Sequence, residues 1–469
     1  MSALWSSLRE PLLLGVLAYI AVQLVLGVVV SRGIKSEGDF VLAGRRLGYG
    51  LVTFSLFATW FGAETCVGSA GAIYSNGLSS VSSDPLGYGL CLLVMGAVFA
   101  VPLRRANLTT FADLFARRFG SGVERLAAIL LIPTSVFWAA AQIRAFGQVL
   151  ATCAPDLDAA WAISLAAGVV LIYTISGGML ADAITDVVQG IALIAGLVLL
   201  LALVVMSLGG IGPALATITP EQLELRPSDS STLTWLNDWA NPVFGSILAT
   251  ELVARVLAAR SPKVAQRSSF AAGGLYLVIG AIPVLLGLIG AHLLPGLEDG
   301  ERILPALAQE HLPGFLYVLF AGALVSAILS TVDSALLVAG SLASHNILLS
   351  IRPRISERQK LLAVRLAVLA FGLMAYGLAL DADSGRALMQ EANGFGSAGI
   401  VVAAVFGLFT GFGGRRSAYA SLLAGTGVWI AAHHVWPQEA DYLLSLGAAL
   451  LGYILVALFE RGRSLTPGV

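Results

Sequence analysis

Four closely spaced oxygen-bearing side chains follow Ser326 in one apolar segment, SAILSTVDSALL at residues 326–337. Ser330, Thr331, Asp333 and Ser334 fall within little more than one helical turn of each other. A single Ser or Thr could simply hydrogen-bond to the preceding turn. Hard cations, however, prefer oxygen ligands, and three hydroxyls with a carboxylate supply such a set. The spacing therefore favours a sodium site over hydroxyls that serve only the helix.

A second unusual segment is SLFATWFGAETCVG, residues 55–68, where Glu64 stands among apolar residues between two glycines. Glycine weakens a helix, and carbonyls freed at a break can coordinate a cation where they line a cavity. A similar glycine-bearing segment, NPVFGSILATEL at 241–252, follows five predicted helices later. Paired interrupted helices indicate an inverted-repeat transporter with its site near the bilayer midplane.

Several charged residues lie inside otherwise apolar segments, where charge is costly and points to function. They are Glu64, Arg144, Asp186, Glu251, Arg255 and Asp333. Glu251 and Arg255 could form an i,i+4 helix pair. Glu64 could neutralise Arg144 across helices, as buried charges usually do. The sequence offers no neighbouring cation for Asp186 or Asp333, which favours a bound ion there.

The composition requires a membrane setting for these residues. Of 469 residues, 57% are hydrophobic and 12% are charged, whereas soluble proteins have about 25% charged residues. Apolar runs near the 20 residues needed to cross a bilayer recur throughout, and the charge pattern gives no basic stripe for nucleic acid. We predict an all-α polytopic membrane protein with helices at about 11–32, 50–76, 85–104, 123–151, 159–177, 185–209, 239–258, 270–294, 313–350, 362–380, 389–411, 417–436 and 441–460.

The loops differ in charge when they are assigned alternately to the two sides. Most basic residues fall on one side, among them Arg45, Arg46, Arg104, Arg105, Arg260, Arg415 and Arg416. The other side has only Arg9, Arg226, Arg302 and Arg386. The positive-inside rule then predicts an external amino terminus and a cytoplasmic carboxyl terminus.

Over about residues 40–460 the sequence resembles the sodium:solute symporter family, through FVLAGRRLGYG, SLFATWFGAETCVGSAGAIYSNG, YTISGGMLADAITDVVQG and AGALVSAILSTVDSALL. The resemblance implies thirteen helices, sodium-coupled uptake and an inverted five-plus-five core of the leucine-transporter type. We accordingly expect a single transporter domain over 1–469. Its expected parts are an extra first helix at 11–32, a first repeat at 50–209, a second at 239–411 and two C-terminal helices within 417–460.

The same resemblance implies positions for the ions. The shared sodium site of the family uses groups at the break of the first core helix and on the eighth core helix. Here it implies Ala58, Phe61, Ala327, Ser330 and Thr331. Some members have a second site with an aspartate on the fifth core helix. Asp186 matches that position, with Asp333 and Ser334 as companions.

Within the family, the segments FATW, PLGYGLCLL and SVFWAAA most resemble the high-affinity choline transporter branch. Members of this branch hold choline in an aromatic cage, and Trp60, Tyr88 and Trp138 match it. A quaternary ammonium is held by aromatic faces, although tryptophan and tyrosine also anchor helix ends at membrane interfaces. This chain departs from the branch at three places, with Ala249 or a neighbour replacing a fourth cage tryptophan and Glu64 and Arg144 replacing small residues. The candidate substrate residues are Trp60, Glu64, Tyr88, Trp138, Gln142, Arg144 and Glu251.

We therefore expect a symporter that imports a small organic solute, choline or another quaternary ammonium, with Na+ as the coupling ion and no organic cofactor. An arginine near the site could instead bind a carboxylate, so an amino acid such as proline, or a carboxylate, is the alternative substrate. A membrane sensor with a transporter fold is the alternative class. We expect no enzymatic activity, no nucleic-acid partner, and a multi-pass location in the lipid bilayer of the plasma membrane, the inner membrane of a bacterium.

Overall fold

The structure is a computed structural model that describes residues 13–18, 20–22, 25, 36–62, 64–80, 82–153, 157–176, 178–226, 230–297, 299–351, 356–382 and 384–460. The described part of the chain is helical, with one isolated β-bridge and no β-strand. The first predicted helix, 11–32, lies largely outside these residues, but those described between 13 and 22 are helical.

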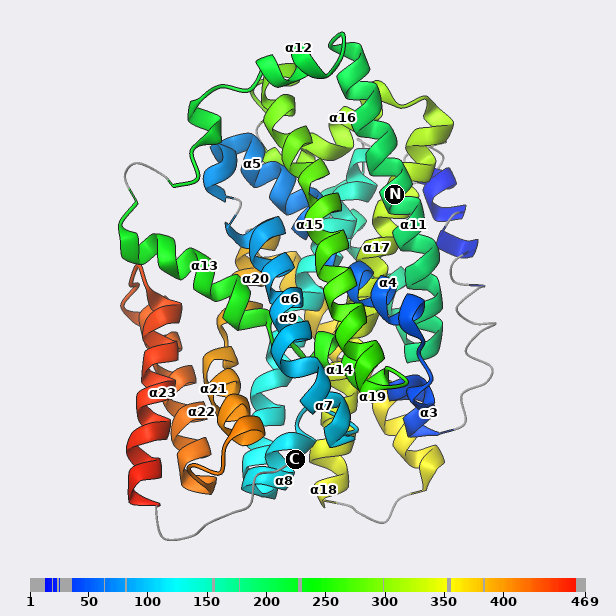
Figure 1. The fold of residues 1–469 in the computed structure, drawn as a ribbon. Helices are drawn as coiled ribbons and strands as arrows, with labels where there is room; N and C mark the ends of the chain where they lie inside the picture. Colours follow the sequence, from blue (N-terminus) through cyan, green and yellow to red (C-terminus); the bar gives the residue numbers. More distant parts are fainter. Residues whose placement is uncertain are drawn as a thin grey trace.

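The first half of the chain contains two long helices and several segmented ones (Figure 1). Its elements are α3 (Glu37–Leu42), α4 (Tyr49–Trp60), the π-helical turn η2 (Glu64–Ser69), α5 (Ala70–Asn76), η4 (Ser82–Gly87), α6 (Tyr88–Val94), η5 (Met95–Phe99), α7 (Ala100–Ala106), α8 (Asp113–Phe119), α9 (Ser121–Cys153), α10 (Ala159–Ser176), α11 (Met179–Ser207) and α12 (Ile211–Ala216).

The second half continues from the green to the red part of the ribbon in Figure 1, where the last two long helices stand side by side at one edge. Its elements are α13 (Thr232–Ser246), α14 (Thr250–Ala258), α15 (Pro262–Leu293), η7 (Gly300–Arg302), α16 (Ile303–His311), α17 (Gly314–Ser341), η8 (Leu342–Leu348), α18 (Leu349–Ile351), α19 (Glu357–Asp381), α20 (Gly385–Gly394), α21 (Ser397–Phe409), α22 (Arg415–Ile430), η9 (Ala431–Val435) and α23 (Asp441–Phe459).

These elements agree with the predicted membrane helices. Among the described residues, eight helices are long and apolar enough to cross a membrane, or ten if each of two bent pairs is one span. The first segment, α10 and α22 are shorter helices at the three other predicted positions. Of the apolar windows, 72% of that in α9 and 76% of that in α17 is buried, against 22% in α19 and 28% in α23. The first two helices therefore form the interior, and the last two offer their apolar surfaces to lipid.

The first bent pair breaks where the sequence predicts it. Helix α4 ends at Trp60, and the chain turns by 52° before it continues through η2 and α5. A Cβ built on Gly62 would lie 2.8 Å from Thr331 Oγ1 and 3.0 Å from Gln142 Oε1. Only a glycine leaves room for side chains from both α17 and α9 to approach the break this closely.

The second bent pair, α13 and α14, turns by 41° across Ile247–Ala249. The two pairs are connected away from their breaks, where Leu47, just before α4, accepts a hydrogen bond from Arg260 N–H (2.9 Å) and donates one to the Ala258 carbonyl at the end of α14 (3.3 Å). A third interruption separates α20 from α21 at Gly396, whose φ of +71° favours glycine. Three interrupted helices thus meet around the uninterrupted helices α9 and α17.

Candidate sodium and substrate sites

Thr331 connects the predicted sodium helix to the first break. Its side chain is fully buried, and its hydroxyl lies 3.1 Å from the Thr59 carbonyl on α4 and 3.1 Å from the Ala327 carbonyl on α17. The helix end at Trp60 leaves carbonyls near the break without the next turn of helix to bond. A hydroxyl and two carbonyls facing one another are a suitable set of ligands for a hard cation.

The other residues predicted for this site are close to Thr331 in the chain or at the end of α4, but not all of them contact the site through their own oxygen atoms. Ala58, Phe61 and Ala327 are all buried at the junction of α4 with α17. The carbonyl that Thr331 contacts on α4 belongs to Thr59, a residue the sequence analysis did not select. The hydroxyl of Ser330 instead donates to Asp186 Oδ1. Of the two predicted hydroxyl ligands, Thr331 therefore faces the first break, whereas Ser330 belongs to the neighbouring acidic cluster.

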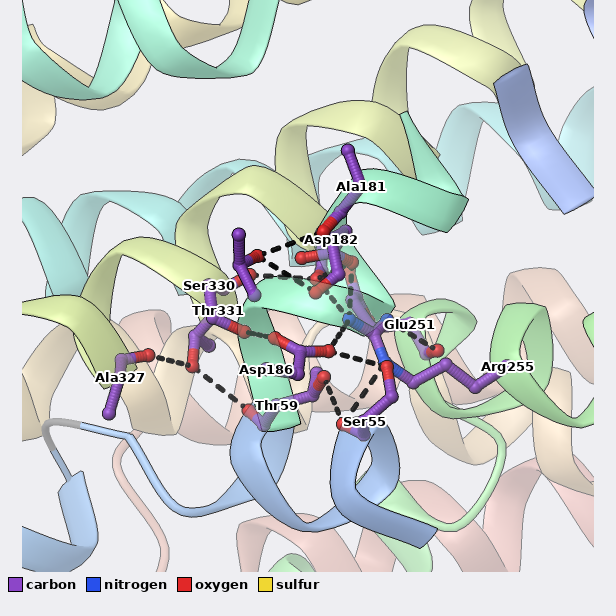
Figure 2. Close-up of polar contacts among 12 residues, drawn as sticks. Ser55, Thr59, Ala181, Asp182, Asp186, Glu251, Arg255, Ala327, Ser330 and Thr331 are labelled. Carbon is purple, nitrogen blue, oxygen red and sulfur yellow. Dashed lines mark hydrogen bonds and ion pairs between the residues drawn. The ribbon is translucent and has the colours of Figure 1, made fainter. Parts of the chain in front are cut away.

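That acidic cluster lies between α4, α11, α14 and α17 (Figure 2). Asp186 of α11 accepts hydrogen bonds from Ser330 and, at 2.5 Å, from Ser55 of α4. Ser334, one turn beyond Ser330, donates to Asp182 Oδ2 at 3.0 Å. Asp186 therefore contacts Ser330, which was predicted for the first site, whereas its predicted companion Ser334 contacts Asp182.

Arg255 from α14 enters the cluster as its counter-charge. Its Nη2 lies 2.7 Å from Asp182 Oδ2 and 3.6 Å from Asp186 Oδ2, and Nε donates to Ser55 Oγ at 2.9 Å. The same Nη2 also donates to Ser334. The expectation that Asp186 has no protein cation nearby is therefore wrong, because helix packing supplies one from a distant part of the sequence.

The i,i+4 ion pair that Glu251 and Arg255 could form is absent from the contacts of the described residues. Both residues are described, yet the guanidinium Nη1 reaches only the backbone carbonyl of Glu251, at 3.3 Å. The Glu251 carboxylate accepts instead from Ser135 (2.5 Å) and Thr250 (3.2 Å). Tertiary contacts with Asp182 outweigh the local helix spacing, which stabilises an exposed pair by only about 0.2–0.5 kcal/mol.

The charge of the cluster remains unbalanced if all its carboxyl groups are ionised. Asp333, also buried, interacts electrostatically with Asp182, Asp186 and Arg255. Asp182 Oδ1 and Asp333 Oδ2 have no hydrogen-bond partner among the described residues. Three carboxylates against one guanidinium would leave two negative charges at fully buried side chains, and such charge requires further pairing. A cation or bound protons would provide it.

The three predicted cage aromatics come together from three helices. The Trp60 and Trp138 rings lie 5.8 Å apart with an interplanar angle of 32°, and Tyr88 meets Trp138 edge to face at 6.1 Å. The Tyr88 hydroxyl accepts a hydrogen bond from Asn393 of α20 at 2.8 Å. Both indole N–H groups are buried without an acceptor among the described residues. The cluster thus combines aromatic faces with two unused donors.

A small cavity of about 30 Å³ adjoins the Trp60 and Trp138 rings. Its lining includes Trp60, Trp138, Ala249, Glu251 and Asn393. Ala249, the proposed replacement for a fourth cage tryptophan, lies at the break between α13 and α14 and borders this space. The volume holds about one water molecule, so an organic solute could enter only if the surrounding helices separate.

The remaining substrate candidates occupy different places. Gln142 lies beside Gly62, one helical turn from Trp138 on the same face of α9. Arg144 lies on another face of this helix, and its guanidinium donates to the Ala379 carbonyl of α19 at 3.2 Å. The side chain of Glu64 is outside the described residues, so its predicted pairing with Arg144 is untested.

A larger cavity of about 240 Å³ lies between η2, α5, α9, η7 and α20. Its lining includes Asp84, Glu301, Ser384 and Met389. Asp84 is held by Thr65 (2.6 Å) and Tyr276 (2.9 Å), which attach η4 to the first broken helix and to α15. Helix α20 contributes to both cavities, since Met389 borders this one and Asn393 the aromatic one.

Comparison with known proteins decides the family. The profile of the sodium:solute symporter family matches residues 40–425, which is most of the chain. The chain belongs to the sodium:solute symporter family. It is therefore a membrane transporter that uses Na+ as its coupling ion and carries a small solute, as the motifs predicted.

Relatives of this symporter include transporters of different solutes. It is 28% identical over 407 residues to the high-affinity choline transporter 1 of Caenorhabditis elegans, covering 79% of this chain and 69% of that protein. The sodium/pantothenate symporter of Haemophilus influenzae is 27% identical over 362 residues, with 72% of each chain covered.

Solved structures confirm the predicted fold class. A Na+-coupled sialic acid symporter in a substrate-bound outward-open state superimposes with a TM-score of 0.83 at 19% identity, covering 97% of each chain. This chain therefore has the inverted-repeat fold that the paired broken helices predicted, of the leucine-transporter type that the family resemblance implied.

Proposed function

We propose that this symporter imports a small organic cation, with a quaternary ammonium such as choline as the best fit. The observation that carries the proposal is a cavity lined by Trp60, Trp138 and Glu251, with Tyr88 packed edge to face on Trp138. Aromatic faces attract a cation that cannot donate hydrogen bonds. A nearby carboxylate strengthens the preference for positive charge.

Two indole N–H groups at this site could bind a hydroxyl group at the end of the substrate away from its ammonium. The indole N–H groups of Trp60 and Trp138 are buried and without acceptors in the described part of the chain. Buried donors normally find a partner, and a hydroxyl oxygen on the substrate would supply one. Choline has both a quaternary ammonium and a hydroxyl, which agrees with its place among the solutes of related proteins.

Sodium would bind where Thr331 faces the broken end of α4, and a second ion would share the cluster of Asp186, Asp333 and Ser334. Because Trp60 is the last residue of α4, an ion that orders this helix end also orders one wall of the aromatic cavity. Sodium and substrate then stabilise one another's binding, and this coupling is reciprocal. Separation of the helices around the cavity would admit and release the solute in alternation.

A carboxylate is the second candidate substrate, because a sodium/pantothenate symporter is among the relatives. Arg144 is the residue that would bind it in the sequence-based hypothesis. Arg144 donates to the Ala379 carbonyl of α19, whereas the described lining of the aromatic cavity includes the carboxylate residue Glu251 and not Arg144, which favours the cation. A sensor with a transporter fold remains the alternative class, without a specific observation in its favour.

We further propose the membrane arrangement that the loop charges predict. The amino terminus would be external and the carboxyl terminus cytoplasmic, in the plasma membrane of the cell, the inner membrane of a bacterium. Residues 50–209 and 239–411 would form the two inverted repeats of a single domain, because each begins with a bent helix pair, of 52° and 41°. Transport would require neither catalysis nor an organic cofactor.

Binding of choline to the purified protein tests the substrate proposal. Isothermal titration with choline in NaCl should give saturable binding, and replacement of NaCl by KCl should weaken it. Trp138→Ala removes a cage face and should lower the affinity at least tenfold, since a desolvated cation–aromatic contact is worth about 2 kcal/mol. Trp161→Ala is the matched control, because Trp161 is 58% exposed on α10. Equal choline binding in the Trp138→Ala variant would exclude the cage.

A further inference from the structure

Two histidines and a glutamate form a cluster on a different side of α20 from the cavities. Glu391 lies on α20, and His433 and His434 lie on the π-helical turn η9 that follows α22. One ligand atom from each of the three lies within 4.8 Å of the other two. The π-helical turn presents consecutive histidines toward the same carboxylate, an arrangement of the kind that such turns often provide at functional sites.

The distances in this cluster differ from those of ordinary ion pairs. His433 Nε2 is 3.5 Å from Glu391 Oε1, and His434 Nε2 is 3.4 Å from Oε2. Charge-assisted hydrogen bonds are shorter, about 2.7–2.9 Å. Ligands of a tetrahedral zinc ion, each about 2.0–2.1 Å from the metal, are separated by roughly 3.3–3.4 Å. Each histidine nitrogen therefore lies about one such ligand–ligand separation from one oxygen of the Glu391 carboxylate, and the three ligand atoms lie within 4.8 Å of one another.

A second carboxylate orients one of the histidines. Asp441, at the start of α23, lies 2.6 Å from His433 Nδ1, and its Oδ1 accepts from Asn237 Nδ2 at 3.0 Å. Trp429 stacks on the His433 ring at 4.9 Å. A histidine that binds a metal through one nitrogen almost always donates the other N–H to such a group, which fixes its tautomer and direction. His433 Nε2 is thus left free to face Glu391.

We propose that Glu391, His433 and His434 form a binding site for a divalent transition-metal ion, with Zn²⁺ as the best fit. Two imidazoles and one carboxylate are ligands that zinc accepts. The side chains of Glu391, His433 and His434 are 22%, 29% and 48% exposed, so an ion can reach them from water. Three protein ligands leave a fourth position for water, as in an exchangeable site.

A bound ion would restrain α20. Helix α20 ends at the glycine-containing interruption before α21, and it carries Asn393 and Met389, which border the two cavities. Glu391 lies between these residues on the same short helix. The metal would connect this segment to η9, and any movement of α20 during transport would then require the ion to leave. The site therefore also makes the transporter sensitive to zinc.

Zinc titration of the purified, metal-free protein tests the site independently of the transported solute. We expect one Zn²⁺ per chain, and Co²⁺ should give the visible absorption of a tetrahedral site. His434→Ala and Glu391→Gln should each weaken binding at least tenfold, and Asp441→Asn by about 10–100-fold. His311→Ala, which alters a histidine on α16, should bind like the parent chain. Because His434 is half-exposed, the His434→Ala variant should keep its fold, and its melting temperature without metal should equal that of the parent chain.

The proposal is overturned if the parent chain binds no zinc. It is also overturned if His434→Ala and Glu391→Gln leave zinc binding unchanged.

The restraint is tested by sodium-driven uptake into proteoliposomes with micromolar free Zn²⁺. The parent chain should be inhibited, and a chelator should restore its uptake. The His434→Ala variant should transport normally without zinc and resist inhibition. Equal uptake with and without zinc in a protein that binds it would refute the restraint of α20. Uptake of no tested solute by the parent would count against the proposed substrate, whereas the zinc titration would still decide the site.

Discussion

Thr331→Ala is the substitution that most sharply tests how this symporter holds sodium. The hydroxyl of Thr331 is fully buried and spans 3.1 Å to the Thr59 carbonyl at the end of α4 and 3.1 Å to the Ala327 carbonyl within α17. The substitution removes one oxygen ligand and one bridge between the two helices. It leaves the helix-forming tendency of α17 intact, because alanine is the best helix former.

The expected magnitude follows from these two losses. A hydroxyl that bonds only to a neutral carbonyl contributes about 1 kcal/mol, whereas a hydrogen bond to a charged group contributes about 1.5–3 kcal/mol. By analogy with the charged case, loss of a sodium ligand should raise the half-saturating sodium concentration about tenfold to a hundredfold. The solute concentration that gives half-maximal uptake at saturating sodium should change much less.

The assay is solute uptake into proteoliposomes at a series of external sodium concentrations. Thr331→Ser keeps the hydroxyl and should retain most of the sodium affinity. Ser341→Ala is the matched control, because Ser341 is a buried residue of the same helix whose hydroxyl donates to the Leu337 carbonyl, at 2.6 Å. An unchanged sodium dependence in the Thr331→Ala variant, with normal maximal uptake, would remove Thr331 from the ion site.

Three other substitutions test separate parts of the structure. Glu251→Gln removes one charge beside the aromatic cavity and should lower choline affinity about tenfold in titration calorimetry, because two charges roughly 8–16 Å apart interact by about 1–2 kcal/mol at an effective dielectric of about 20. Unchanged affinity would exclude a role in cation binding. Arg255→Gln leaves Asp182 and Asp186 without their guanidinium and should lower the free energy of unfolding by about 3–5 kcal/mol. The melting temperature should fall, and Asp182→Asn should partly restore it. A melting temperature equal to the parent's would contradict the assigned ion pair. Glu460 accepts hydrogen bonds from three backbone N–H groups at the start of α22, at 2.8–3.1 Å. Glu460→Ala should therefore lower the free energy of unfolding by about 1–2 kcal/mol in the same melting assay, while Glu310→Ala on α16 should have no effect. Equal melting temperatures of the two variants would argue against this cap of α22.

The sequence predicts the helices well because membrane crossing leaves a strong signal. Long apolar runs specify α9, α15 and α17 directly. Gly62 marks the break of the first core helix in the sequence, and in the structure two side chains approach the position where its Cβ would be. Trp60 and Trp138 also come together as the resemblance implies. In each case the information is local or lies in a motif.

The missed contacts depend on helix starts and on tertiary packing. Asp182 stands four residues before Asp186, on the same face of α11, but the apolar pattern predicts this helix from 185 whereas it starts at Met179. The pattern therefore places Asp182 in a loop, and helical spacing offers Arg255 only Glu251 on its own helix. The contact joins residues 73 positions apart, a pairing that helical periodicity cannot reveal.

The same limit applies to the group of Glu391, His433 and His434. The two histidines are neighbours in the sequence, but Glu391 comes from an element more than 40 positions earlier. The π-helical turn that orients them has no clear signal in the apolar pattern around it. Only the packing of η9 against α20 makes the three residues a candidate site.

The central claim, sodium-coupled import of an organic cation, is tested most directly by uptake of labelled choline into proteoliposomes. Uptake should be measured with and without an inward sodium gradient, with proline and pantothenate run in parallel. The structure predicts choline accumulation that requires the gradient and disappears in Trp138→Ala. Sodium-driven uptake of proline or pantothenate without choline would contradict the assignment of the aromatic cavity to a cation.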